Sequence, residues 1–363
     1  MRRILRTASY GILVLLSCQC SFAHIHSGEV DPRELELGEK IAQMVEERWE
    51  RINDPAKTAR LAMILERLTP YLTRPLPYET RLIDEPSPNA FSLPGGIIFV
   101  TSGMYDFIRS DSQLAGILAH ELVHSDRKHG MIQASRNQKL SIVTIAIVIA
   151  TQGQAAPAIL SSVAQTAISN SYSKDLEREA DLIGVDLLAN AGFEASGMLT
   201  IIEALAEDEI KHPWVDPGIY MSHPYIEERI SYIIDWIREK GFSLHRKESL
   251  NLLKPSVVII EGKIHLLIDG LTVWSGPDEP QVDHLMRKTA SLLEEHLQLE
   301  TLPYDIEVIQ LPDQINRALR VGTSLIAKEP LSVSVPPLEE FRRNIISALL
   351  AAQKKHPITN FLR

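Results

Sequence analysis

The sequence predicts an α+β protein in two parts: a mainly helical region with a small β-sheet over residues 24–248, and a smaller α+β module over residues 249–363. In the first part, apolar residues recur at helical spacing between capping signals, and two short strand-like runs stand between prolines and glycines. In the second part, Glu-Gly and Asp-Gly dipeptides join three short apolar runs, as in an antiparallel meander. The 363 residues suit about two domains at roughly 150 residues each.

The composition is that of an ordinary folded protein with an acidic balance. Lys and Arg number 37 against 47 Asp and Glu, which gives a formal charge of -10, and 45% of the residues are hydrophobic. Disordered and collagen-like classes are therefore excluded. No nucleic-acid partner is expected, because such proteins normally carry a basic stripe. The two cysteines, Cys18 and Cys20, stand close together near the N-terminus and predict no disulfide framework.

The N-terminal segment has the pattern of an export signal. Three arginines within residues 2–6 precede an apolar run at 10–16, which is shorter than the roughly 20 residues of a membrane-spanning helix. Small residues then precede a cleavage site after Ala23, so residues 1–23 are expected to be a signal peptide. The alternative is a lipoprotein anchored through Cys18, because the residues before it resemble a lipobox.

The first helices and strands follow from local signals. Asp31-Pro32 and Asp54-Pro55 each combine an N-cap acid with proline at the first helical position, which predicts helices to about Arg51 and to Leu68. Short strands are expected at 80–83 and 97–101, with Pro94-Gly95-Gly96 as a turn. A small sheet beside helices is implied.

An apolar stripe after Ser110 predicts a long helix, with Gly130 as its C-terminal cap.

Residues 140–170 are almost uncharged, but their apolar run at 142–150 is too short to span a bilayer. A helical hairpin packed in the core or over the active site is favoured. Peripheral membrane contact through 140–170 is the alternative.

The later helices and strands are predicted from the same capping and turn signals. Ser173 is expected to cap a helix that ends before Gly192, and Pro224 to open another that reaches Lys240. The meander strands are expected at 257–260, 263–268 and 271–274, followed by a helix at 281–297, a strand at 305–311 and a helix at 338–354. No internal repeat of fixed period is apparent.

The motif His120-Glu121-Leu122-Val123-His124 predicts a metal site. Two histidines four residues apart on a helix lie on one face, so both imidazoles can reach one ion, while Glu121 at the side can activate a water. The competing interpretation is a pair of solvated histidines on a polar helix face. His129, five residues after His124, is interpreted as a charge at the helix end.

A catalytic zinc usually takes three protein ligands and leaves one position to water. In the helix after Ser173, Glu177 and Asp181 share a face, whereas Glu179 points elsewhere. Glu177 is therefore the expected third ligand, with Asp181 accepting a hydrogen bond from a ligand histidine. Gly184, one turn further along, would let this helix lie close to its neighbour. A solvated acidic helix face is the alternative.

Three ordered motifs carry a resemblance to a known family: Asn89-Ala90-Phe91-Ser92-Leu93-Pro94-Gly95-Gly96, His120 to His124, and Glu177 to Asp181. Over about residues 31–240 the chain resembles the zinc metallopeptidases typified by HtpX, the CAAX prenyl protease and mitochondrial Oma. Ser222-His223-Pro224 and Arg229 make it most similar to the soluble periplasmic branch, the β-barrel assembly-enhancing protease. The resemblance implies a mainly helical, gluzincin-type peptidase domain.

The resemblance also implies roles for individual residues. One zinc per chain would be held by His120, His124 and Glu177, with Glu121 as general base. His223 would occupy the open zinc position as an inhibitory plug, with Arg229 nearby, and either could donate to the transition state. The strand with Asn89, Ala90 and Phe91 would pair with an extended substrate.

The expected function is an exported, periplasmic zinc endopeptidase that acts on unfolded or misassembled envelope proteins, with the outer-membrane assembly machinery as a candidate partner. The alternative is a chaperone-like assembly factor with a latent zinc site. An intramembrane peptidase is disfavoured, because long apolar spans are lacking. The soluble periplasmic branch carries helical repeats of the tetratricopeptide type, whereas residues 249–363 read as α+β, so the role of this module is unassigned.

Overall fold

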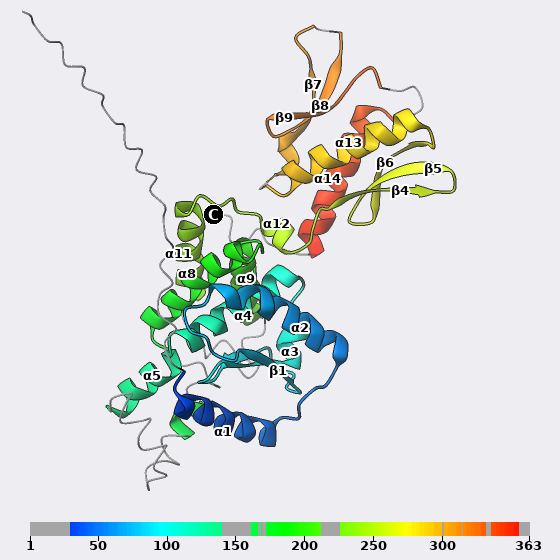
Figure 1. Cartoon of the computed structure of the whole chain (residues 1–363). Helices are drawn as coiled ribbons and strands as arrows, with labels where there is room; N and C mark the ends of the chain where they lie inside the picture. Colours follow the sequence, from blue (N-terminus) through cyan, green and yellow to red (C-terminus); the bar gives the residue numbers. More distant parts are fainter. Residues whose placement is uncertain are drawn as a thin grey trace, which may run out of the picture.

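The computed structural model confirms the α+β class, with a helical body around helix α4 and a second group of strands and helices at the C-terminal end (Figure 1). It describes residues 30–139, 161–165, 168, 172–211, 226–299, 301–313, 315–331 and 335–355. Most of the 140–170 segment, residues 1–23, which are expected to be a signal peptide, and His223 therefore lie outside the described residues. Among the helices of the described ranges, none is long and apolar enough to cross a membrane.

The first two helices begin where their capping signals predict. Helix α1 spans Pro32–Arg48, and the Asp31 side chain accepts a hydrogen bond from the Arg33 backbone. Helix α2 spans Pro55–Leu68 and continues into a short 3-10 turn, η1, at Thr69–Tyr71. Proline at the first helical position fixes φ and loses only a donor that has no intrahelical partner.

The first sheet places an edge strand against the central helix. Its strands β1 (Glu79–Ile83), β2 (Ala90–Ser92) and β3 (Ile97–Thr101) lie in the order β1-β3-β2. Strand β1 runs parallel to β3, and β2 runs antiparallel to it. The central strand β3 is buried along its whole length and leads into α3 (Ser102–Phe107), while β2 contacts α4.

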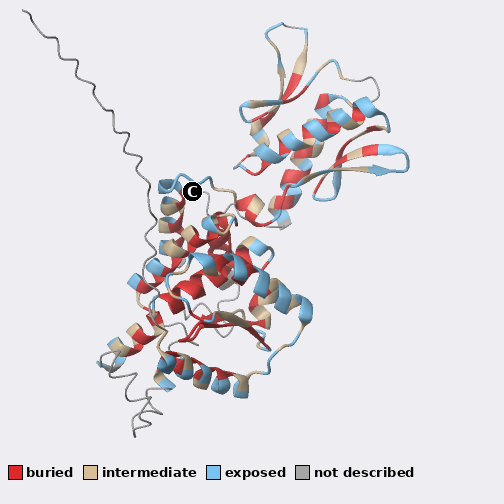
Figure 2. Ribbon diagram, viewed as in Figure 1, coloured by how far each residue is buried: buried red, intermediate tan, exposed pale blue. Residues whose placement is uncertain are grey.

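Helix α4 spans Asp111–Asp126 and is buried from Gln113 to its end, as Figure 2 shows for the centre of the body. Ser110 caps it as predicted, by accepting from the Gln113 backbone. The expected cap at Gly130 is wrong. The helix stops at Asp126 because Lys128 takes a left-handed conformation, with φ 60°, and a separate helix α5 begins at His129 and ends at Gln138.

Helices α8 (Lys174–Asn190), α9 (Ser196–Lys211) and α11 (Ile226–Glu239) complete the body. As expected, Gly184 allows close packing, because a Cβ there would lie 2.6 Å from the Met198 side chain and 3.5 Å from the His120 backbone nitrogen. Ser173 stands at the N-cap of α8, but its hydroxyl accepts from Arg136 instead of capping the helix.

A short helix, α12 (Arg246–Ser249), links the body to the C-terminal module. The module contains β4 (Pro255–Ile260), β5 (Lys263–Ile268), β6 (Leu271–Pro277), α13 (Pro280–Leu297), a 3-10 turn η2 (Pro303–Asp305), β7 (Ile306–Gln310), β8 (Arg317–Val321), β9 (Ser324–Lys328) and α14 (Leu338–Lys355). The order of an antiparallel three-stranded meander followed by an 18-residue helix thus occurs twice. The intervening loops differ in length, so no fixed period appears in the sequence.

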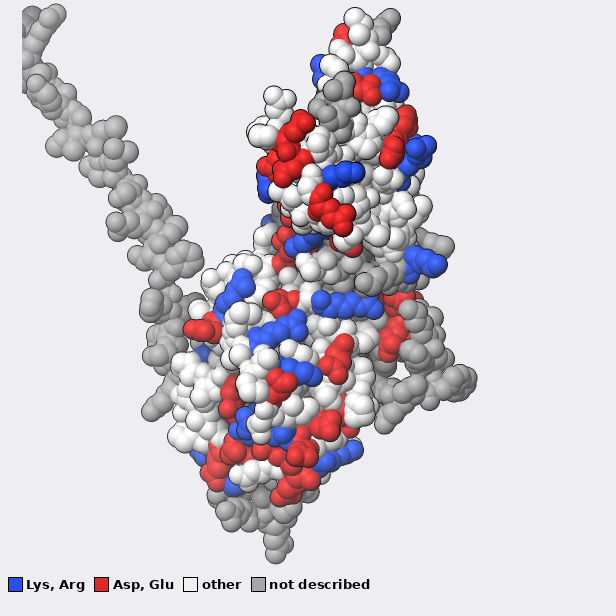
Figure 3. Space-filling model, turned by 90° about the vertical axis from the view of Figure 1, so that its right-hand side faces the viewer, with Lys and Arg blue, Asp and Glu red and all other residues white. Residues whose placement is uncertain are grey.

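The hydrophobic core divides between the body and the module. The largest cluster extends from α2 to Ile237 of α11, while a separate cluster begins at Leu250. Within the module, the rings of Trp274 and Phe341 stack at a centroid distance of 4.5 Å and hold β6 against α14. On the face shown in Figure 3, acidic and basic side chains of the described residues are interspersed, without a continuous basic stripe.

Candidate metal centre

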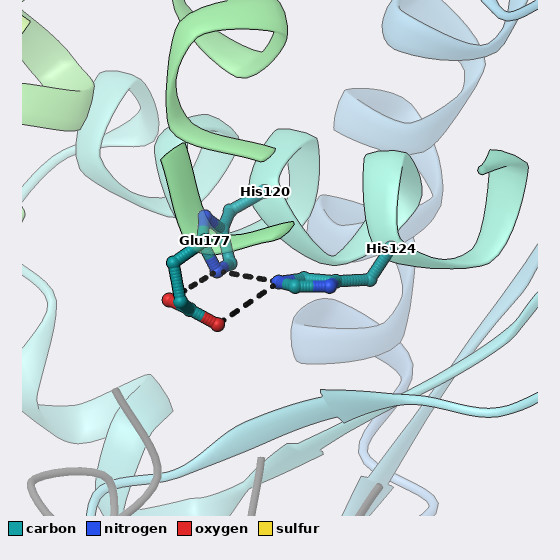
Figure 4. Close-up of side chains that lie close together, drawn as sticks. All are labelled: His120, His124 and Glu177. Atoms are coloured by element: carbon teal, nitrogen blue, oxygen red, sulfur yellow. Dashed lines mark hydrogen bonds and ion pairs between the residues drawn. The ribbon is translucent and has the colours of Figure 1, made fainter. Parts of the chain in front are cut away.

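Three buried donor groups converge where α8 crosses α4 (Figure 4). The Nε2 atoms of His120 and His124 lie 3.0 Å apart. The Glu177 carboxylate closes the triangle, with one oxygen 3.7 Å from His120 Nε2 and the other 3.5 Å from His124 Nε2. Sequence positions 120 and 177 are thereby brought together by the close approach of the two helices.

These donors suit zinc. With zinc–ligand bonds of about 2.0–2.1 Å in a tetrahedron, neighbouring ligand atoms should lie about 3.3 Å apart, close to the three separations above. Two imidazoles and one carboxylate are also a set that zinc accepts. Burial lowers the pKa of His124 to about 4, so this ring is neutral at physiological pH and can offer a lone pair.

Asp181 lies behind His120, as the helical spacing predicted. One carboxylate oxygen is 2.9 Å from His120 Nδ1, the nitrogen that faces away from Glu177. Arg229 donates to both oxygens of Asp181, at 2.8 and 2.9 Å, and Tyr232 donates a further hydrogen bond. Burial alone would raise the pKa of Asp181, but Arg229 and His120 outweigh it and hold that pKa far below its usual range.

Arg229 links this network to the metal triangle. It is itself buried, and its remaining nitrogen, Nη1, lies 3.5 Å from a Glu177 oxygen. The guanidinium thus neutralises charge from both carboxylates, which lowers the cost of burying them. Its contacts with Asp181 and Glu177 thus hold the two carboxylates of the site together.

Glu121 lies beside the triangle and is completely buried. Burial and the nearby Glu177 charge raise the pKa of Glu121 well above its usual value, while hydrogen bonds from the Ser92 backbone and side chain act in the opposite direction. Because Ser92 is the last residue of β2, the edge strand and the carboxylate are held together. A carboxyl group whose pKa is raised is suited to accept a proton near neutral pH.

The residues expected to bind substrate, Asn89, Ala90 and Phe91, directly precede Ser92 along the chain. The side chains of Ala90 and Phe91 are buried, and Phe91 stacks on Phe99 of β3. The Asn89 side-chain amide donates to the Ile168 carbonyl. Two of these three side chains therefore belong to the core, which leaves the backbone of the strand as the means of contact with a peptide.

Two residues that contact His124 were not found from the sequence. The interpretation of His129 as a helix-end charge is wrong: the ring is fully buried, and burial together with His124 lowers its pKa to about 3. Its Nδ1 lies 2.9 Å from His124 Nδ1. On the other side, Tyr172 stacks on the His124 ring at a centroid distance of 4.0 Å. In the sequence, the only sign of His129's role was a third histidine close to the motif. Its position could not be predicted, because the helix breaks between His124 and His129.

Comparison with known proteins assigns the family. The profile of Peptidase family M48 matches residues 55–237, half of the chain, from the start of α2 into α11. The chain belongs to peptidase family M48. The match includes all residues of the candidate metal centre described above, and it ends before the C-terminal module of this M48 chain.

Curated relatives are similar over the same part. A putative β-barrel assembly-enhancing protease from Vibrio cholerae is 29% identical over 208 residues, 55% of this chain and 43% of the relative. The β-barrel assembly-enhancing protease of Escherichia coli is 27% identical over 55% of this chain and 42% of its own length. The mitochondrial metalloendopeptidase OMA1 of Schizosaccharomyces pombe is 29% identical over 45% and 48%. The match thus spans less than half of each relative.

A second group of donors lies outside the M48 match. Glu194, His245 and Glu248 meet where α12 begins, with His245 Nδ1 at 3.2 and 3.5 Å from the two carboxylates. All three are only partly buried, and burial together with Glu248 raises the pKa of Glu194. Contacts between an imidazole and its two acidic neighbours account for this arrangement without a metal.

Proposed function

We propose that this M48 chain is an exported zinc-dependent endopeptidase that hydrolyses peptide bonds in misfolded or misassembled envelope proteins. The observation that carries the proposal is the buried triangle of His120, His124 and Glu177, with Glu121 beside it. These three residues would hold one zinc ion, and Asp181 would orient His120. Family membership and the names of the relatives support the same activity.

A zinc ion bound there supplies a Lewis acid that polarises the scissile carbonyl and makes water a nucleophile near neutral pH. In the proposed mechanism, Glu121 takes the proton of the attacking water and delivers it to the leaving amine. Its burial excludes bulk water from this transfer, and Ser92 holds the carboxylate against the edge strand. Arg229 contacts Asp181 and Glu177, which favours an orienting role over the transition-state role expected from the sequence.

Substrate recognition is proposed to follow the backbone of β2. An extended peptide that added to this strand would run past α4 and its metal ligands. Because the Ala90 and Phe91 side chains point into the core, such pairing would depend little on sequence and would favour unfolded segments. The plug role of His223 remains a proposal, since this residue lies outside the described ranges.

Location and organisation are proposed from the sequence. Residues 1–23 would direct export to the periplasm, with cleavage after Ala23, or lipid attachment at Cys18 as the alternative. Residues 24–248 would form the peptidase domain and 249–363 a separate module. The outer-membrane assembly machinery is a proposed partner because two relatives are named for β-barrel assembly. Contact of residues 140–170 with a membrane surface is a further proposal.

The test is cleavage of an unfolded protein such as reduced, alkylated lactalbumin by the zinc-loaded chain. Glu121→Gln should lower the rate by about 10²- to 10⁴-fold, the usual contribution of a general base, with zinc content unchanged. Glu227→Gln, an exposed substitution on α11, is the matched control and should keep the full rate. Equal rates in all three proteins would contradict the proposal. Rescue of a null strain by Glu121→Gln would favour the chaperone-like alternative.

A further inference from the structure

We infer that His129 is a positioning residue for the metal site, which fixes the imidazole of His124 through a hydrogen bond between their Nδ1 atoms. The inference rests on the proposed zinc site but concerns a residue outside the ligand set. His124 faces His120 and Glu177 with Nε2, so its Nδ1 points away from the triangle. That Nδ1 lies 2.9 Å from His129 Nδ1, a full hydrogen-bond contact between two buried rings.

The proton assignment follows from the ligand role. If His124 Nε2 gives its lone pair to zinc, the neutral ring must carry its proton on Nδ1, and that N–H must donate. The acceptor is then His129 Nδ1, which must be unprotonated. His129 therefore carries its proton on Nε2, which lies 3.5 Å from the Glu179 carboxylate. The hydrogen bond thus runs from His124 to His129, and His129 Nε2 faces the Glu179 carboxylate beyond hydrogen-bond contact.

The backbone break after α4 makes this contact possible. Had the helix continued, a residue five positions after His124 would have pointed away from it. The left-handed Lys128 instead turns the chain, so that the first residue of α5 faces back toward the site. Tyr172 covers the face of the His124 ring, while His129 holds its edge. Two contacts thus determine the orientation of one ligand ring.

The two ligand histidines are consequently held by different chemistry. His120 Nδ1 faces the carboxylate of Asp181 at 2.9 Å, whereas His124 Nδ1 faces the imidazole of His129, to which it donates in the tautomer inferred above. Partners of this kind, behind a metal ligand, typically change metal affinity or activity by about 10- to 100-fold when removed. We expect His129 to act mainly through the orientation of His124, because a neutral imidazole adds less electron density to its partner than a carboxylate does.

The first measurement uses the unsubstituted, zinc-loaded protein. Long-range proton–nitrogen NMR of the protein labelled with ¹⁵N-histidine reports which ring nitrogens carry protons, and His129→Asn assigns the His129 signals by their loss. The expected result is a neutral His129 with its proton on Nε2. A proton on Nδ1 of His129 would overturn the inference, because that nitrogen could not accept from His124.

The second measurement is zinc affinity by chelator competition, with the visible spectrum of the cobalt-loaded protein as a report on ligand geometry. His129→Leu should weaken zinc binding by about 10- to 100-fold and alter the cobalt spectrum. His129→Asn should lower the zinc affinity less, because its amide oxygen can accept a hydrogen bond from His124. His265→Leu, in the module, is the control. Unchanged affinity and spectrum in folded His129→Leu would overturn the inference alone, whereas absence of zinc binding by the unsubstituted protein would overturn the proposed function as well.

Discussion

The helical body and the C-terminal module bury similar aliphatic and aromatic side chains, but they differ in the polar groups that they bury. In the described part of the body and the adjoining α12, the buried acidic and basic residues are Glu34, Arg81, His120, Glu121, His124, Asp126, His129, Glu177, Asp181, Glu203, Arg229, Arg246 and Lys247. From Leu250 onward, the buried polar residues of the described ranges are the neutral Thr289, Gln298 and Thr301. Burying a charge is costly unless it is paired. Some of these residues, such as Arg246 and Glu203, form ion pairs with each other, whereas those from His120 to Arg229 that surround the metal centre place charge where the proposed chemistry needs it.

The largest expected effect comes from removing a metal ligand. Glu177→Gln should abolish both zinc binding and cleavage, because a neutral amide is a poor zinc ligand. Zinc at 100 times its Kd should raise the unfolding free energy of the unsubstituted body by about 2.7 kcal/mol, and the unfolding of the module should not respond. Calorimetry with and without zinc measures both transitions. If zinc also raised the stability of the module, the two regions would not differ as described.

The next effect concerns the buried ion pair behind the site. Arg229→Met leaves the Asp181 carboxylate buried without its main partner and should destabilise the body by about 3 to 5 kcal/mol. Urea unfolding of the metal-free protein measures this loss. Arg317→Met in the module, which breaks a half-buried pair with Glu329 at the surface, is the matched control and should have a much smaller effect. Similar losses in both variants would contradict the account.

A smaller effect is expected from the apolar core of the module. Phe341→Leu removes the stack on Trp274, and an aromatic pair contributes about 0.5 to 1.5 kcal/mol beyond its buried area. The unfolding midpoint of the module should fall, while zinc affinity should stay unchanged. Zinc titration and Trp274 fluorescence report the two effects separately. A reduced zinc affinity would show that the module supports the metal site.

The smallest effect concerns Tyr78, which donates to the buried Asp126 just after the end of the motif. Tyr78→Phe should cost about 1 kcal/mol. Burial, and then the Asp126 charge, raise the pKa of Tyr78 well above its usual range. The folded state therefore holds this proton more tightly, and the contribution of Tyr78 is lost as pH rises above about 10, where the unfolded chain ionises. Unfolding from pH 8 to 11 should show the gap between the two proteins narrowing; a constant gap would contradict this.

Much of the fold could be predicted from local sequence signals. The Asp-Pro pairs before α1 and α2 act within one turn, so they predict where these helices begin without reference to the rest of the chain. Helix α9 was not predicted, because residues 195–203 are all buried. Such a continuous buried run has no amphipathic stripe by which a helix could be told from a strand. Strands β8 and β9 were also missed, since neither five-residue segment alternates strictly between apolar and polar residues.

At the candidate site, too, local sequence signals predict only part of the structure. Helical spacing relates His120 to His124 and Glu177 to Asp181, and the structure brings the two pairs together. Spacing could not place His129, because its contact depends on the left-handed Lys128 that breaks the helix. The Ser173 hydroxyl is also used differently from its predicted cap, since Arg136 reaches it from another helix. In both cases the position of the side chain depends on tertiary structure that local spacing does not reveal.

The central claim is that one zinc ion lies between His120, His124 and Glu177. Anomalous diffraction at the zinc absorption edge from crystals of the zinc-loaded protein tests it most directly. The account predicts one strong peak at about 2.0–2.1 Å from each of these three side chains. A protein without a peak there, or with its zinc at Glu194, His245 and Glu248 instead, would contradict it.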